Sequence, residues 1–109
     1  MISTDYKFGE VKDLAPQIEG GNDRVQFRNI FSNDNGGVSL LAFKAGQGLD
    51  THVAAAEVMV TVLEGEIEFT MLDKVNVMRS GQFLLMGRDV PHSVKATVDS
   101  KIMLIKIKP

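Results

Sequence analysis

The chain has 109 residues, enough for one hydrophobic core and too few for two domains. Its formal net charge of -2, without a basic run or patch, argues against nucleic acid as a partner. The absence of cysteine excludes disulfides, thiolate metal sites and a cysteine nucleophile. No apolar run has the length of a signal-peptide core or a membrane span, so we expect a cytoplasmic protein with no membrane partner.

A polar lead-in segment, residues 1–24, precedes a predicted β-hairpin. In the lead-in we expect one short strand near Lys7–Val11 and no long helix, because Pro16 and two adjacent glycines interrupt it. Residues 25–32 and 38–45 are the two strands of the hairpin. The Asn-Asp-Asn-Gly-Gly sequence between them accepts the positive φ angles that tight turns demand.

The two faces of the first hairpin strand differ in polarity. Its apolar face carries Val25, Phe27 and Phe31. Gln26 lies on the opposite face, and it reaches the mouth of a pocket if that polar face is the inner one. The alternative for Gln26 is a solvated surface position.

The rest of the chain reads as short strands separated by turns. Residues 58–63 are almost wholly apolar, which predicts a strand buried on both faces. Other short segments alternate in polarity or are apolar throughout: residues 66–72, 75–80, 83–86, 92–98 and 101–108. No segment has a helical period, and roughly eight to ten strands predict an antiparallel β-sandwich or barrel. The predicted core includes Val60, Val62, Phe69, Phe83, Leu85 and Val94.

One stretch carries two glycines and a histidine at a recognisable spacing: Gly46, His52 and Gly65. They occupy the corresponding positions of the pattern GxxxxxHxHxxxExxxxxxG, the first motif of the cupin superfamily. Ala54 stands where the motif has its second histidine, and Val58 stands where it has glutamate. The stretch therefore resembles the first cupin motif, with apolar residues at two ligand positions.

A later stretch resembles the second cupin motif, GxxxxxPxGxxHxxxN. Gly81 and His92 occupy its first glycine and its histidine. The other three positions differ, since Gly87 replaces the proline, Asp89 the second glycine and Ala96 the asparagine.

These two regions, residues 46–69 and 81–96, make the chain similar to a single cupin domain over residues 1–109. Cupins are small jelly-roll β-barrels, so the resemblance selects this topology among the all-β alternatives. Cupins also usually hold a metal between the two motifs. We therefore expect a cupin-type jelly-roll barrel in which His52 and His92 point into one cavity.

The incomplete ligand set limits what metal such a site can hold. A catalytic zinc site keeps three protein ligands, and only His52 and His92 remain here. Glu57 could replace the missing carboxylate only with a bulge, because a shift of one residue in a strand reverses the side-chain direction. The resemblance thus implies at most a weakly held divalent transition metal as cofactor.

The two histidines also have interpretations that need no metal. They can be structural groups that are hydrogen-bonded inside the core. Alternatively, they form a paired site that binds an anionic ligand or relays a proton, with Ala54 and Val58 as the apolar wall.

Three functions therefore compete. The first is a barrel that binds a small organic molecule, and the apolar Ala54 and Val58 favour it. The second is a metal-dependent cupin enzyme, such as an isomerase, dioxygenase or decarboxylase. The third is a non-catalytic module that acts through its dimer, and the retention of both histidines argues against it.

We also expect a homodimer. Two predicted strands carry apolar residues on both faces, and a barrel has only one interior. The residues on the second face are Met59, Thr61 and Leu63 in one strand and Met103, Ile105 and Ile107 in the other, and most of them are apolar. An outer apolar surface of this kind is uncommon on a monomer.

Overall fold

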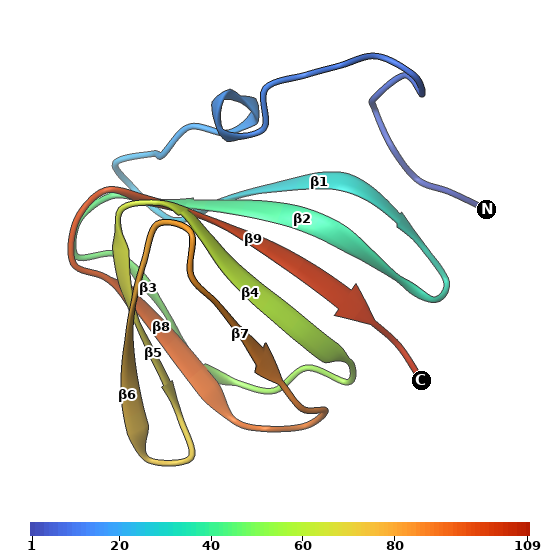
Figure 1. Cartoon of the computed structure of the whole chain (residues 1–109). Helices are drawn as coiled ribbons and strands as arrows, with labels where there is room; N and C mark the ends of the chain where they lie inside the picture. The colour runs from blue at the N-terminus through green and yellow to red at the C-terminus, as the bar shows by residue number, and fades with distance from the viewer.

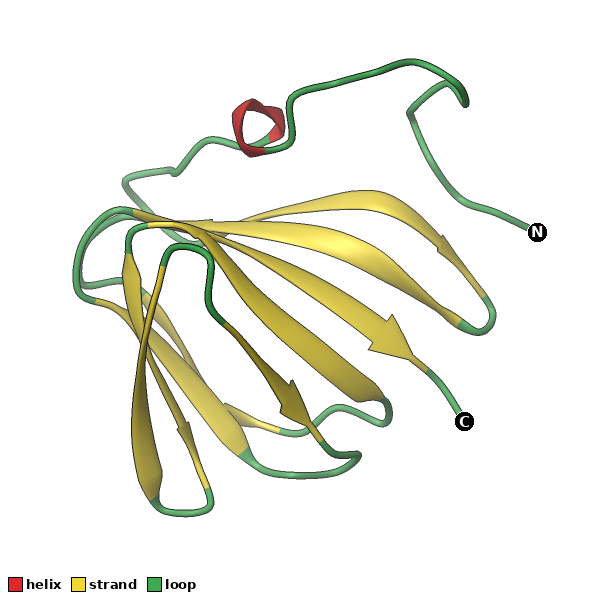
Figure 2. Cartoon of the chain, viewed as in Figure 1, coloured by secondary structure: helices red, strands yellow, loops and turns green.

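The computed structural model describes residues 1–109, which form two facing antiparallel sheets (Figure 1 and Figure 2). The larger sheet has the strand order β1-β2-β9-β4-β7, and the smaller sheet has the order β3-β8-β5-β6. The strands are β1 Gln26–Asn33, β2 Gly36–Phe43, β3 Gly48–His52, β4 Glu57–Glu64, β5 Glu66–Met71, β6 Lys74–Arg79, β7 Phe83–Met86, β8 His92–Ala96 and β9 Ser100–Ile107. The predicted all-β jelly-roll class is confirmed. The one helical segment is a short 3-10 turn, η1 (Ala15–Gln17), and nothing helical has the length and hydrophobicity of a membrane span.

The predicted hairpin is present as β1 and β2, and its tip rests on the C-terminal strand. The amide of Asn35 donates to Oδ1 of Asn33 across the turn (2.8 Å). Gly36 follows with φ of 145°, a conformation that L side chains rarely adopt. A Cβ at position 36 would overlap the backbone carbonyl of Lys106 in β9. Glycine is therefore required here for close approach as well as for φ.

The expectation that Phe27 and Phe31 share a face is wrong. A register shift between Asn29 and Phe31 adds a bulge to β1, so the alternation of side chains is broken between the two aromatics. Phe27 pairs with Leu41 and lies on the inner face of the sheet. It is nevertheless 65% exposed, because β1 is the outermost strand and the smaller sheet does not cover it (Figure 1).

The main core lies between the two sheets. Four of the predicted core residues belong to it, which confirms them: Val60, Val62, Phe69 and Val94. Phe83 and Leu85 do not, and these two predictions are wrong. They are 59% and 68% exposed, because β7 pairs with β4 in a register that aligns Phe83 with Thr61 and Leu85 with Met59, on the outer face. Met86 has the opposite parity and is buried in the core.

A second, smaller cluster lies on the outer face of the larger sheet. Ile18 of the lead-in packs there against Leu40 and Ala42 of β2, with Leu63 and Met103 at its border. The lead-in forms no strand near Lys7–Val11, so that prediction is wrong. It crosses the outer face as an extended segment that contains η1 (Figure 1), and part of the surplus apolar surface is covered by the chain itself.

Candidate functional site

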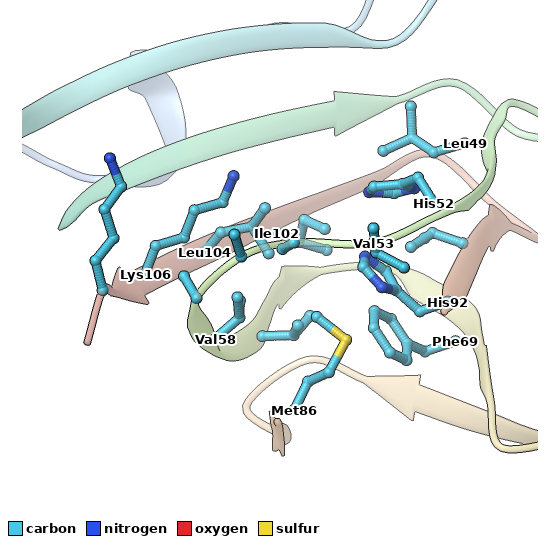
Figure 3. A pocket seen from close by; sticks show the side chains of 16 residues that line it. Leu49, His52, Val53, Val58, Phe69, Met86, His92, Ile102, Leu104 and Lys106 are labelled. Carbon is cyan, nitrogen blue, oxygen red and sulfur yellow. The ribbon is translucent and has the colours of Figure 1, made fainter. Parts of the chain in front are cut away.

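The structure brings the two histidines together. His52 is the last residue of β3 and His92 is the first residue of β8, and the two are direct partners in the antiparallel pairing of these strands. Their ring centroids are 4.1 Å apart with an angle of 56° between the planes. The turn that leads to His92 is also fixed, since the amide of Asp89 donates to the carbonyl of Ala54 (2.9 Å). Strand pairing and this turn thus place both imidazoles at one wall of the sandwich (Figure 3).

Backbone carbonyls set the tautomer of both rings. Nδ1 of His52 lies 2.8 Å from the carbonyl oxygen of Asp50, and Nδ1 of His92 lies 2.9 Å from that of Val90. A carbonyl oxygen only accepts, so Nδ1 carries the proton in each neutral ring and Nε2 keeps a lone pair. Neither Nε2 has a hydrogen-bond partner in the protein. In its neutral form, each ring therefore presents Nε2 as an acceptor to whatever lies in front of it.

His92 is held in its neutral form. Burial lowers the pKa of His92, and the charges of His52 and Lys106 lower it further, against the opposing effect of the hydrogen bond to Val90. His92 is only 6% exposed, and its ring stacks on Phe69 with centroids 5.5 Å apart and planes at 11°. His92 is thus a fixed, neutral acceptor, whereas His52 lies nearer to solvent.

An interior cavity of about 210 Å³ opens in front of the histidines. Its walls come from both sheets and are mainly apolar, and the lining includes Val58, Val60, Ile102, Leu104, Met86 and Val94. Ala54 and Val58, which stand at ligand positions of the first motif, are both part of this wall. The apolar residues thus stand where carboxylate and imidazole would otherwise be.

The charges around the cavity all have one sign. Apart from the two histidines, Lys106 and Lys108 are the only ionisable residues in its lining, and no aspartate or glutamate lines it. Glu57 is exposed and alternates with the inward Val58, so it points to the outer face. The bulge that could have turned Glu57 inward is not present in β4 at this point.

Gln26 is not part of the cavity, which corrects the expectation that it reaches the pocket mouth. It pairs with Ala42 and shares the outer face of the sheet with it. Its Nε2 donates to the carbonyl of Arg24 (3.0 Å). The apolar face of this strand, not the polar one, is the inner face.

Sequence reasoning missed the two lysines of the lining. Ile102, Leu104 and Lys106 share one face of β9 by simple alternation, so the position of Lys106 could have been found. Lys108 follows the strand, and only the folded chain places it at the cavity.

The residues present do not form a closed site for a transition metal. No group of three or more His, Cys, Asp or Glu side chains comes together in the structure. Two imidazoles supply neither the charge nor the coordination number of a closed site, and the positive charge of Lys106 in the lining disfavours a cation.

A two-sheet jelly roll with a histidine pair on the wall of an interior cavity defines the class of small cupin-like barrels. The family model for the cupin domain matches residues 39–108. The chain therefore belongs to the cupin family. No curated protein matches it in sequence.

Solved structures agree with this assignment. A conserved protein of unknown function from Streptococcus pyogenes superposes with a TM-score of 0.89 and 24% identity, covering 97% of this chain and 93% of that one. An RmlC-like cupin protein from Desulfovibrio desulfuricans gives a TM-score of 0.80 and 28% identity, over 90% and 95% of the two chains. A predicted oxalate decarboxylase from Thermotoga maritima shares the fold at a TM-score of 0.71, with 17% identity and coverage of 78% and 81%. At identities of 24% and 17%, the first and the last of these likenesses concern the fold alone.

Proposed function

We propose that this chain binds a small organic molecule in the cavity between its sheets. The observation that carries the proposal is the pair of imidazoles whose Nε2 atoms have no protein partner, on the wall of an otherwise apolar cavity. A hydroxyl or N–H group of the ligand would donate to Nε2 of His52 or His92. Its apolar body would lie against Val58 and Val60.

The size of the cavity indicates the size of the ligand. Drug-sized ligands occupy pockets of about 300–1,000 Å³. The volume of about 210 Å³ lies below that range, so the proposed ligand is smaller than a drug molecule. A few directional hydrogen bonds in an apolar surrounding would orient it.

A metal-dependent cupin enzyme is the second candidate, because two fixed Nε2 lone pairs are also what a metal would bind. Any divalent metal bound there would need water or substrate to complete its shell. We propose that such a metal is held weakly and is removed by mild chelation.

The test is a thermal-shift screen of hydroxylated fragments, with and without chelator, beside metal analysis of protein purified without an affinity tag. The variant His52→Ala/His92→Ala should lose fragment binding and keep its β-sheet circular dichroism. Val58→Phe, which fills the apolar wall and leaves both histidines, should lose binding as well. Stoichiometric zinc, iron, nickel or manganese that survives dialysis against chelator would instead favour the enzyme.

We further propose that the chain forms a homodimer through the outer face of the larger sheet. The lead-in covers only one part of this face, and Phe83 and Leu85 remain exposed beside Met59. Sedimentation at tens of micromolar, an order-of-magnitude choice for a weak interface, should give a dimer. The variant Phe83→Ser/Leu85→Ser should give a monomer, and a monomeric unmodified protein would contradict the proposal.

A further inference from the structure

We propose that the cavity selects an organic anion and that Lys106 and Lys108 bind its charged group. This inference rests on the proposed function, because it names the class of ligand for the same cavity. The charged group would be a carboxylate or a phosphate ester, and the remainder of the ligand would be apolar.

The direction of β9 puts a positive charge at one end of the cavity. Lys106 is the direct partner of Val58 in β4 and of Gly37 in β2, so its side chain follows Ile102 and Leu104 on the inner face. The strand therefore changes from apolar to cationic as it leaves the space between the sheets. Figure 3 shows Lys106 at one end of the cavity and the two histidines at the other.

Neither lysine is neutralised by the protein. Other lysines form ion pairs within 4 Å, among them Lys44 with Asp99 and Lys101 with Glu19 and Glu64. Lys106 and Lys108 form none, and the cavity lining contains no carboxylate. Two uncompensated positive charges beside an apolar space attract an anion and repel a cation.

Neutral polar groups extend the same end of the cavity. A neighbouring open depression shares Lys106 and Lys108, and its lining includes Asn29, Ser32 and Ser39. Ser39 pairs with Leu104, so it lies on the inner face where β2 continues beyond the cavity. Amide and hydroxyl groups can donate to a carboxylate or phosphate that the lysines already hold.

His92 is a poorer place for the charged group. Its neutral ring offers a lone pair at Nε2, which repels an anionic oxygen and accepts from a donor instead. An ammonium group only donates. The chemistry of the two ends therefore orients the ligand, with its anion at the lysines and any hydroxyl or N–H group at the histidines.

The test compares three probes with linear alkyl bodies of nearly equal length: hexanoate, hexanamide and hexyl phosphate. Isothermal titration at low salt should show at least one of the anions binding about tenfold more tightly than hexanamide, a factor that corresponds to two partly exposed ion pairs. Preference for hexanoate or for hexyl phosphate supports the inference and identifies the anion. Added sodium chloride should weaken the anions and leave hexanamide unchanged.

Variants assign the effect to the two lysines. Lys106→Met/Lys108→Met removes both charges and keeps most of the side-chain length. It should weaken anion binding about tenfold, again the value for two such pairs, with no change for hexanamide. Lys74→Met removes another exposed, unpaired lysine, on β6 of the other sheet, and should change nothing. Circular dichroism verifies that each variant is folded.

Two results would overturn the inference. Equal affinity for hexanoate, hexyl phosphate and hexanamide would show a cavity that binds apolar bodies without regard to charge, and the proposed function would stand. Failure of both anions to bind at about 10 mM, which corresponds to a negligible affinity, would refute anion selection. The fragment screen with the histidine variant would still decide the proposed function separately.

Discussion

The inner face of the larger sheet has two parts that the same strands build in opposite ways. In the first part the smaller sheet covers it, and Leu41 and Ile102 are buried in the main core. In the second part, Ser39 of β2 lies opposite Leu104 of β9, two positions along each strand from Leu41 and Ile102. The next inward residue of β9 is Lys106. Strand alternation continues without change across both parts. The two parts differ in whether the smaller sheet covers them. The inward side chains are apolar where it does and become polar where it does not.

The largest expected effect tests the difference between the two parts within a single strand. Leu41→Ala should lower the free energy of unfolding by about 2–5 kcal/mol, because it leaves a cavity where two sheets meet. Ser39→Ala, two residues away on the same face, should change it by less than about 0.5 kcal/mol. Urea unfolding of both variants measures the difference. Equal losses would mean that the second part is packed as tightly as the first.

The next effect concerns how the hairpin tip is held over Lys106. Gly36→Ala should destabilise the protein by roughly 1–3 kcal/mol, since the new Cβ meets both an unfavourable φ and the carbonyl of Lys106. Gly46→Ala is the matched control. Position 46 also has a positive φ but has open space around it, so only the backbone strain of about 1 kcal/mol remains. Thermal unfolding measures both losses of stability. A larger loss for Gly46→Ala than for Gly36→Ala would mean that the close approach of Lys106 does not constrain the hairpin tip.

The smallest effect links the two parts through the electrostatics of His92. Its pKa is lowered in the folded protein, so the unfolded chain binds a proton at pH values where the folded chain does not. The free energy of unfolding should therefore fall as the pH decreases below about 6.5 and level off below the pKa of the folded state. His92→Gln should remove this slope. Urea unfolding as a function of pH measures it.

Lys106→Met should raise the pKa of His92, because one of the charges that lower it is removed. The rise should be partial, since burial is the larger cause and is unchanged. NMR titration of the ring resonances reports the shift directly. A pKa that stays the same in this variant would show that the ammonium of Lys106 lies too far from His92 to influence its pKa.

The sequence by itself determined the fold class, the first hairpin and the jelly-roll topology. Alternation over β5 and β8 and the Asn-Gly-rich turn were enough for the all-β class and the first hairpin. The spacing of His52 and His92 within the two motifs indicated the jelly roll. These features are local or follow from a family pattern, so no long-range contact was needed to recognise them.

The tertiary structure alone decided which faces are covered and what meets at the cavity. Phe83 and Leu85 have the composition of core residues, yet the register of β7 against β4 turns them outward. Gln26 lies outside because the apolar face of β1 is the inner one, and a bulge then reverses Phe31. Alternation assigns side chains to two faces but cannot say which face a distant strand or the lead-in will cover. Alternation places Lys106 on the face of Ile102 and Leu104, but the approach of Lys108 to the histidine cavity follows only from the packing of β9 between β2 and β4.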